Sequence, residues 1–229
     1  MQLLNDADLE QSGIIANCRM NRERGLIGSN GYAVEIGFNP SDLLKSGLTR
    51  SPRVNWLDLC CGTGNALIEA ALAVQVDGLQ DRISIVGVDL VPMFSQVPPG
   101  LECLRLVTAS LNSWRPDCHF DLITCVHGLH YIGDKLRLVT DAVGWLTDDG
   151  WLVASLDLSS IKLGHGQSAN RAVGSEFRRQ GLQYDSRKKR VTCEGRKSVT
   201  MPFRYLGADD QAGPNYTGQP AVNSYYERC

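Results

Sequence analysis

Residues 54–72 of the chain read VNWLDLCCGTGNALIEAAL, and this stretch decides the fold. Residues 54–60 are almost continuously apolar, which is typical of a strand buried on both faces, and residues 66–72 follow helical periodicity. The turn between them contains Gly62 and Gly64. Glycine adopts backbone angles closed to other residues and lets a ligand approach the main chain. The stretch therefore predicts a strand, a nucleotide-binding turn and a helix, although a purely structural turn with two glycines has the same pattern.

The second predicted strand, residues 83–89, ends in Asp89. Its offset from the glycine turn is roughly 20 residues, the spacing at which a carboxylate receives the hydroxyl groups of a ribose. Leu67 occupies the place where the dinucleotide pattern G-x-G-x-x-G has its third glycine. Without this glycine, helix and strand cannot pack closely next to a pyrophosphate, so the turn favours a cofactor without phosphates.

Residues 57–64 (LDLCCGTG) and 86–90 (VGVDL) resemble the first two motifs of the class I S-adenosylmethionine-dependent methyltransferases. The resemblance spans residues 52–157 and includes 108–111, beside the adenine in that family, and 120–127, its fourth strand. It implies a Rossmann-like, doubly wound α/β fold with a mostly parallel seven-stranded sheet, an antiparallel last strand and S-adenosylmethionine as cofactor. The residues that it places at the cofactor are Asp58, Cys60, Gly62, Gly64, Asn65, Asp89, Leu90, Ser110, Leu111 and Val126.

Two positions depart from the family's pattern. Cys60 stands where the family's D-x-G-x-G-x-G motif has its first glycine, and a small side chain is a known variation there. Ser110 replaces the acid often found near the adenine amino group. The contact to that amino group is therefore expected to be weaker or to come from the backbone.

The chain of 229 residues is expected to form one domain. We expect an N-terminal helical lid in residues 1–50, the cofactor-binding core in 52–157, and a C-terminal helix, edge strands and loop in 158–229. Helices are predicted over 6–23 and 40–45. The glycine-rich stretch between them is typical of a lid over cofactor and acceptor, and a passive cover of the sheet edge is the alternative. Arg22, Asn30 and Tyr32 are the lid residues expected to face the site.

Further strands are predicted near residues 102–108, 120–126 and 151–156, and further helices near 64–76, 134–146 and 168–181. Residues 190–193 and 198–205 alternate apolar and polar side chains, which predicts two antiparallel edge strands. Residues 207–226 are rich in glycine, proline and asparagine and predict an ordered loop. In this loop, Tyr216 either lines the acceptor pocket or packs against the lid.

Composition indicates an ordinary soluble protein. The formal net charge is −2 and 43% of the residues are hydrophobic, so neither nucleic acid nor a membrane surface is attracted by bulk charge. The acidic start of the chain and the lack of a long apolar run predict a cytoplasmic location. The eight cysteines form no C-x-x-C pair, so we expect reduced thiols and no metal site.

The polar residues that follow the fourth strand are His127, His130 and Tyr131. Ligands bind outside the carboxyl ends of the strands in a doubly wound sheet, so these side chains are expected beside the reacting group. Histidine titrates near neutral pH, which suits a base that takes a proton from the acceptor. A packing role, or stabilisation of a cation by the ring faces, is the alternative.

We therefore expect an S-adenosylmethionine-dependent methyltransferase that acts on a small-molecule or peptide-borne acceptor. Nucleic acid is disfavoured, because the segment after the fourth strand does not resemble the N-P-P-Y motif of amino-nucleobase methylases and the basic run at 187–190 is typical of a surface turn. Two alternatives stay open: an enzyme that cyclises the aminobutyryl chain to azetidine-2-carboxylate with release of methylthioadenosine, and a non-catalytic cofactor-binding partner. The sequence does not indicate the oligomeric state.

Overall fold

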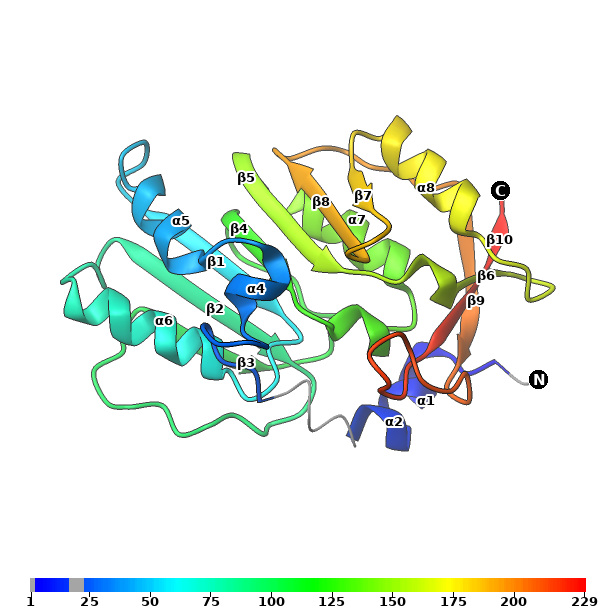
Figure 1. Ribbon diagram of the computed structural model, residues 1–229, viewed down its shortest axis with the longest axis horizontal. Coiled ribbons are helices and arrows are strands. Elements are labelled where there is room, and N and C mark those ends of the chain that lie inside the picture. The colour runs from blue at the N-terminus through cyan, green and yellow to red at the C-terminus, as the bar shows by residue number, and fades with distance from the viewer. Residues whose placement is uncertain (1–2, 17–22) are drawn as a thin grey trace.

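The computed structural model describes residues 3–16 and 23–229, and a seven-stranded sheet forms its centre (Figure 1). The strand order is β3-β2-β1-β4-β5-β8-β7. The pairs β1–β2, β1–β4, β2–β3 and β4–β5 are parallel, whereas β8 is antiparallel to β5 and β7. The predicted sheet is therefore confirmed. Its strands are β1 (Val54–Leu59), β2 (Ile83–Asp89), β3 (Leu104–Thr108), β4 (Phe120–Cys125), β5 (Leu146–Ser155), β7 (Gln183–Asp185) and β8 (Arg190–Glu194).

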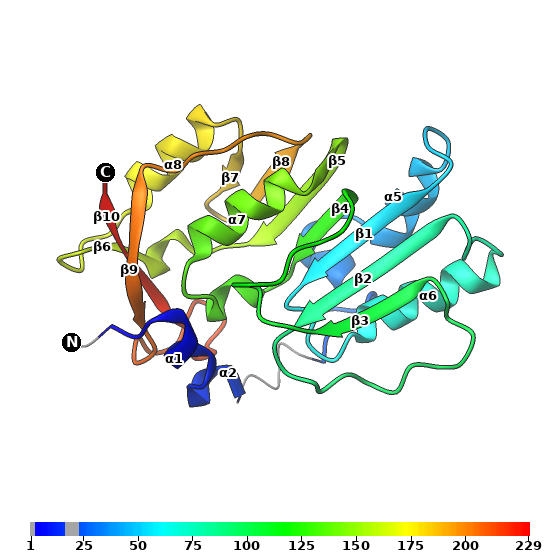
Figure 2. The ribbon, with the colours of Figure 1, turned by 180° about the vertical axis from the view of Figure 1, so that it is seen from behind.

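Helices cover the two faces of this sheet. α5 (Pro40–Gly47) and α6 (Asn65–Val76) lie on one face and α7 (Lys135–Gly144) on the other, as Figures 1 and 2 show from opposite sides. Successive side chains of β1 point to opposite faces of the sheet. Trp56 packs in the apolar cluster that includes α6, and Leu57 packs in the cluster that includes α7. Gly87 lets α6 approach β2, since a Cβ at this residue would lie 2.4 Å from a methyl carbon of Leu67.

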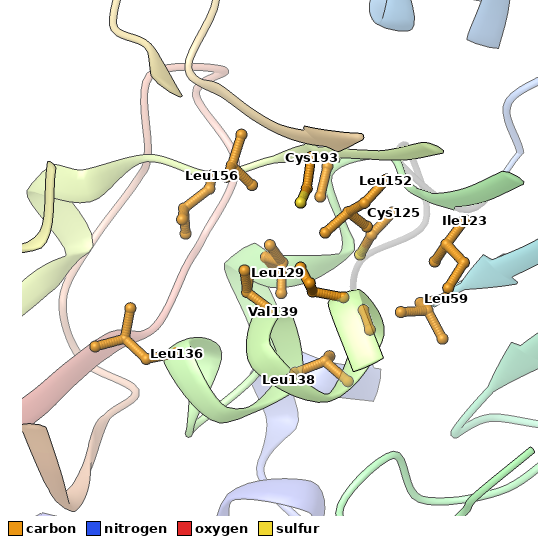
Figure 3. Close-up of a cluster of buried hydrophobic side chains, with 14 of the residues drawn as sticks. Leu59, Ile123, Cys125, Leu129, Leu136, Leu138, Val139, Leu152, Leu156 and Cys193 are labelled. Atoms are coloured by element: carbon orange, nitrogen blue, oxygen red, sulfur yellow. The ribbon is translucent and has the colours of Figure 1, made fainter. Parts of the chain in front are cut away.

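The larger apolar cluster lies between α7 and the strands β4, β5 and β8. In Figure 3 the side chains of Leu129 and Val139 point toward Leu152 and Cys193. Burial of such side chains is worth about 1.5–3 kcal/mol each, which makes this layer a principal source of stability. Cys193 and Cys125 are buried in this layer, where they serve as small apolar side chains.

The N-terminal segment differs from the prediction of one helix over 6–23. α1 (Asp6–Glu10) and α2 (Gly13–Ala16) are separate, because the N–H groups of Gln11 and Ser12 turn back to the carbonyls of Asp8 and Leu9. Another short helix, α4 (Tyr32–Ile36), forms in the glycine-rich stretch. Asn39 is the N-cap of α5, and its side chain accepts from the N–H of Ser41.

The C-terminal segment also differs from the prediction. Residues 198–205 do not supply an edge strand of the main sheet; β7 takes that place, and β9 (Phe203–Asp209) joins a second sheet of order β6-β10-β9. The expected loop over 207–226 is wrong at both ends, because β9 extends to Asp209 and β10 (Asn223–Arg228) begins at Asn223. β10 pairs with β6 and β9, and its residues Ser224, Tyr225 and Tyr226 are buried. The remaining elements are β6 (Ile161–Leu163), α8 (Asn170–Arg179) and the short 3-10 helix η2 (Leu158–Ser160).

In the described part of the chain, no helix combines the length and the apolar character needed to cross a membrane. The division into a lid, a core and a C-terminal part stays a prediction.

A buried lysine joins α7 to the second sheet. Lys135, the first residue of α7, donates from Nζ to the carbonyls of Ile132 and Val222, both at 2.9 Å, and to the hydroxyl of Ser224 at 2.7 Å. Its side chain is fully buried, and burial lowers the pKa of the amine to about 7. The loop before α7 and the start of β10 are therefore held by one side chain.

This lysine predicts a pH dependence of stability. The unfolded chain keeps the Lys135 proton up to its ordinary pKa of 10.5, whereas the folded protein releases it above about 7. The free energy of unfolding contributed by this residue therefore rises with pH between these values. Urea titrations measure the free energy of unfolding. Between pH 7 and pH 9, this free energy should rise by about 2 kcal/mol more in wild type than in Lys135→Met. The exposed Lys188→Met variant is the control. If wild type and Lys135→Met differed by the same free energy of unfolding at both pH values, the lowered pKa of Lys135 would be contradicted.

Candidate functional site

The glycine turn after β1 is fixed by the carboxylate that ends β2. Gly62 has φ 61° and Gly64, the N-cap of α6, has φ 77°, so both occupy the left-handed region that favours glycine. The N–H of Gly62 donates to Asp89 Oδ2 at 2.9 Å, and the N–H of Val91 donates to Oδ1 at 3.0 Å. Asp89 is buried. This carboxylate therefore holds the turn and its own loop in one geometry.

Cys60 is accommodated by a glycine on the neighbouring loop. Its φ is 58°, which is unusual for a residue with a Cβ. A Cβ at Gly128 would lie 2.3 Å from Cys60 Cβ, so a glycine at 128 makes room for the cysteine side chain. The adjacent thiol of Cys125 and burial raise the pKa of Cys60 well above its ordinary value. The thiol is therefore protonated and acts as a small apolar group.

A cavity opens at the carboxyl ends of β1, β2, β3 and β4. Apolar side chains make most of its wall, and carboxylates, an amide and a histidine stand among them. Eight residues predicted for the site line it: Cys60, Gly62, Asp89, Leu90, Leu111, Val126, His127 and Tyr131.

Asp58 lies outside the cavity wall, buried in β1. It accepts from the hydroxyl of Tyr32 at 2.7 Å and from that of Thr124 at 2.5 Å. Burial raises the pKa of the Asp58 carboxyl to about 7, although both hydroxyls oppose the rise. Asn65, also outside the wall, accepts from the hydroxyl of Ser95 at 2.6 Å.

Ser110 contacts the N-terminal helix. Its hydroxyl donates to Glu10 Oε1 at 2.6 Å, and the amide of Asn112 donates to the same oxygen at 2.8 Å. Glu10 and Asn112 line the cavity, whereas Ser110 does not. Helix α1 thus brings a carboxylate to the end of the cavity where the chain lacks the family's acid at position 110.

His127 stands between two partners. It follows β4 with φ 59°, is buried, and precedes the short 3-10 helix η1 (Gly128–Tyr131). Its Nε2 lies 3.0 Å from Glu35 Oε2, and its Nδ1 lies 3.4 Å from His130 Nε2. The ring of Tyr216, which is partly exposed, has its centroid 6.2 Å from that of His127 and 5.5 Å from that of His130. Tyr216 therefore packs on both imidazole rings.

Glu35 and His130, the two neighbours of His127, differ in charge. The contact with His127 lowers the pKa of Glu35 despite partial burial, and Arg24, whose Nη1 lies 2.7 Å from Glu35 Oε1, lowers it further. Burial lowers the pKa of His130 to about 3, and the neighbouring His127 and Lys135 act in the same direction. At neutral pH, Glu35 is therefore an anion and His130 an uncharged ring.

The residues predicted for the lid are not brought together at the cavity. Tyr32 is buried against Asp58. Asn30 is exposed, and its carbonyl accepts from Arg24 at 2.8 Å. Arg22 lies outside the described residues.

Three residues of the N-terminal helices were not predicted from the sequence. Leu9 and Glu10 of α1 line the cavity, whereas Glu35 of α4 contacts His127 without lining the cavity. An amphipathic helix predicts that Leu9 is buried, but no local pattern tells which surface it covers. Glu35 lies in the short helix α4, which the glycine-rich sequence around it did not predict. Over residues 3–16 and 23–229, no group of three or more potential ligands is arranged to hold a metal ion.

The arrangement combines a ligand cavity with an acid–base group at one end. The glycine turn and Asp89 supply backbone and carboxylate contacts for a polar ligand, and Leu90 and Leu111 supply apolar walls for a flat ring. His127 and Tyr131 border the cavity on the side of β4.

Comparisons with known proteins identify a family and several similar structures. The model of a methyltransferase domain family matches residues 33–192. The chain is similar to the structure of CalS10, an amino pentose methyltransferase from Micromonospora echinaspora involved in calicheamicin biosynthesis, with 22% identity over 50% of this chain and 48% of that chain and a TM-score of 0.36. The chain thus spans about half the length of CalS10.

A second similar structure is the N-methyltransferase NodS from Bradyrhizobium japonicum in complex with S-adenosylhomocysteine, with 15% identity over 81% of this chain and 99% of that chain and a TM-score of 0.42. A third is the plantazolicin methyltransferase BpumL, with 12% identity over 65% of this chain and 51% of that chain and a TM-score of 0.39. The comparison with curated proteins finds no match.

The family model covers well over half of the chain and includes the glycine turn, Asp89 and His127. The chain therefore belongs to the methyltransferase domain family, within the class I S-adenosylmethionine-dependent superfamily that the sequence motifs resemble, and its cofactor is S-adenosylmethionine.

Proposed function

We propose that the protein transfers a methyl group from S-adenosylmethionine to a small-molecule acceptor. One observation carries the proposal: a single cavity is lined by the glycine turn, by Asp89 and by His127 with Tyr131. These are the parts needed to hold a nucleoside-bearing cofactor and to place an acceptor group next to it.

The residues present suit the cofactor. Asp89 and Gly62 line the cavity. In this proposal the Asp89 carboxylate accepts from the ribose hydroxyls, and the backbone at Gly62 faces the amino acid end of the cofactor. Leu90, Ala109 and Leu111 form apolar walls suited to an adenine ring. When bound, S-adenosylmethionine supplies a methyl group that its positive sulfur activates. Glu10 is placed to accept from an amino group at the edge of the ring.

The side chains after β4 serve the acceptor. The protein has to orient the acceptor atom, exclude water and take a proton where the acceptor carries one. His127 and Tyr131 border the cavity, and His130 and Tyr216 support them from behind. A histidine that takes the proton, with Tyr131 as a ring face for positive charge, accounts for this cluster.

A small acceptor is favoured over nucleic acid. The basic run of residues 187–190 forms the turn between β7 and β8, and two of its side chains are occupied. Lys189 Nζ pairs with Asp157 at 3.2 Å, and the guanidinium of Arg190 donates to the carbonyls of α4. This run therefore offers a poor track for phosphates. The helical lid and the cytoplasmic location stay predictions.

Product analysis tests the function. The protein is incubated with methyl-labelled S-adenosylmethionine and pools of small-molecule acceptors. Labelled acceptor together with S-adenosylhomocysteine supports the proposal. Methylthioadenosine without a labelled acceptor would indicate cyclisation of the aminobutyryl chain, and tight binding without any product would indicate a non-catalytic partner.

The first prediction of this function concerns Asp89. Asp89→Asn should weaken binding of S-adenosylhomocysteine by ~1.5–3 kcal/mol, because charge-assisted hydrogen bonds to the ribose are lost. Calorimetry measures the affinity. Asp121→Asn is the matched control, since Asp121 also accepts from a backbone N–H, that of Asn55, but lies at the opposite end of the sheet. If Asp89→Asn and wild type bound S-adenosylhomocysteine with equal affinity, Asp89 would not contact the cofactor.

The second prediction concerns Glu10. Wild type should bind S-adenosylhomocysteine about 10-fold or more tightly than S-inosylhomocysteine, which lacks the amino group, and Glu10→Gln should lose most of this preference. Asp8→Asn, a change of an exposed acid on the same helix, should keep it. An unchanged preference in Glu10→Gln would place the amino group elsewhere.

The third prediction concerns the histidines. Replacement of His127 or His130 by Gln should lower kcat by ~10²–10⁴ while the affinity for S-adenosylhomocysteine stays within a few-fold, because a base acts on the acceptor. Initial rates and calorimetry separate the two effects. The exposed His119→Gln variant is the control. Losses below ~10-fold in both variants would mean that alignment alone drives catalysis.

A further inference from the structure

Glu10 is held at the cavity by two donors from the loop that follows β3. The hydroxyl of Ser110 and the amide nitrogen of Asn112 both donate to Glu10 Oε1, at 2.6 and 2.8 Å. Glu10 and Asn112 line the cavity. Within residues 3–16 and 23–229, no group donates a hydrogen bond to the second oxygen, Glu10 Oε2. One oxygen of the carboxylate is therefore occupied, and the other is left for a ligand.

The amide of Asn112 is oriented in turn by Arg137 of α7. The guanidinium Nη2 of Arg137 donates to Asn112 Oδ1 at 2.5 Å. A guanidinium only donates and a carboxylate only accepts, so Asn112 turns its carbonyl oxygen toward Arg137 and its NH2 group toward Glu10. Without Arg137 this amide would be able to flip, and its carbonyl oxygen would then face the Glu10 carboxylate. Arg137 therefore determines whether Asn112 supports Glu10 or opposes it.

The guanidinium of Arg137 is fixed by its own helix. Its Nη1 lies 2.9 Å from Oδ2 of Asp141, one turn later, and its Nε lies 3.8 Å from Oδ2 of Asp134, the N-cap of α7. The backbone N–H of Arg137 also donates to Asp134 Oδ1 at 3.1 Å. Leu136, Leu138 and Val139 of the same helix are buried in the larger apolar cluster. A row of contacts thus runs from a firmly packed helix, through Asn112, to Glu10.

We propose that Asn112 and Arg137 are positioning residues that hold Glu10 with Oε2 toward the cofactor and so make the site specific for adenine. The inference rests on the proposed function, in which the base of the cofactor lies at this end of the cavity. The amino group of adenine donates to Oε2. A purine with a carbonyl oxygen at the same place, such as hypoxanthine, would bring two acceptors together and leave both without a donor, which costs free energy.

Equilibrium binding tests the inference without turnover. Calorimetry gives the dissociation constants of S-inosylhomocysteine and S-adenosylhomocysteine, and their ratio measures the preference for adenine. Arg137→Met should lower this ratio about 5-fold, because the hydrogen bond that orients Asn112 is lost. Asn112→Asp should lower it at least as much, because the new side chain still accepts from Arg137 but has an oxygen in place of the donor to Glu10. Arg137→Lys keeps a donor and should retain part of the preference.

Arg115→Met is the matched control. Arg115 shares Asp141 with Arg137, at 3.6 Å, but donates to the backbone carbonyl of Asn112, at 3.4 Å, rather than to its side chain. This variant should leave the ratio unchanged. A second control places Arg137→Met in a Glu10→Gln background, where it should change the ratio no further, because Arg137 acts through Glu10.

A ratio equal to that of wild type in both Arg137→Met and Asn112→Asp would overturn the inference. This result includes the case in which the affinities for both ligands fall equally, as loss of general support for the loop would cause. If Arg137→Met does not fold, as circular dichroism would show, Asn112→Asp still decides the outcome.

The product screen separates this inference from the proposed function. A protein that shows the expected ratios but methylates no acceptor would contradict the proposed function and leave the role of Asn112 and Arg137 standing. Unchanged ratios in a protein that does methylate an acceptor would overturn the inference alone.

Discussion

A carboxyl group buried inside the sheet, that of Asp58, is the constraint on which the site depends. A buried polar group without hydrogen-bond partners costs about 1–3 kcal/mol, so the fold must bring donors to it. One donor is Thr124 on β4, which in turn accepts from the indole of Trp56 at 2.8 Å, and the other is Tyr32 on α4. Satisfying this carboxyl therefore ties the N-terminal segment to the middle of the sheet.

The same tie connects the two halves of the site. Tyr32 and Glu35 belong to one short helix, so fixing the first over Asp58 places the second beside His127. Asp89 performs a similar task at the glycine turn, because it accepts from the N–H of Gly62. The carboxyl of Asp58 lies within the sheet and the carboxylate of Asp89 lines the cavity at its edge, although the sequence presents both as acids at the ends of strands.

The central sheet could be predicted because its determinants are local. The apolar run of β1, the glycine turn and the helical periodicity of α6 stand within one short stretch, and each strand of the core repeats such a pattern. Asp89, Leu111 and His127 were predicted at the site because parallel strands end at one edge of the sheet. The contacts of Glu10 and Glu35 span large sequence separations, as 100 residues between Glu10 and Ser110 illustrate, and no periodicity encodes them. β10 was missed because a short strand in a tail rich in glycine and proline acquires its order from its partners.

The position of β10 at the end of the chain has a consequence for biogenesis. The loop that carries the histidines is supported from behind, since the N–H of Val222 donates to the carbonyl of His130 and Lys135 reaches Val222 across 87 residues of sequence. Chains leave the ribosome from the N-terminus, and early segments fold first. The loops after β1, β2 and β3 are thus made long before the support of the histidines exists. A nascent chain therefore makes three of the loops that line the cavity before it makes the strand that supports the histidine loop, and this support is the last part of the site to be synthesised.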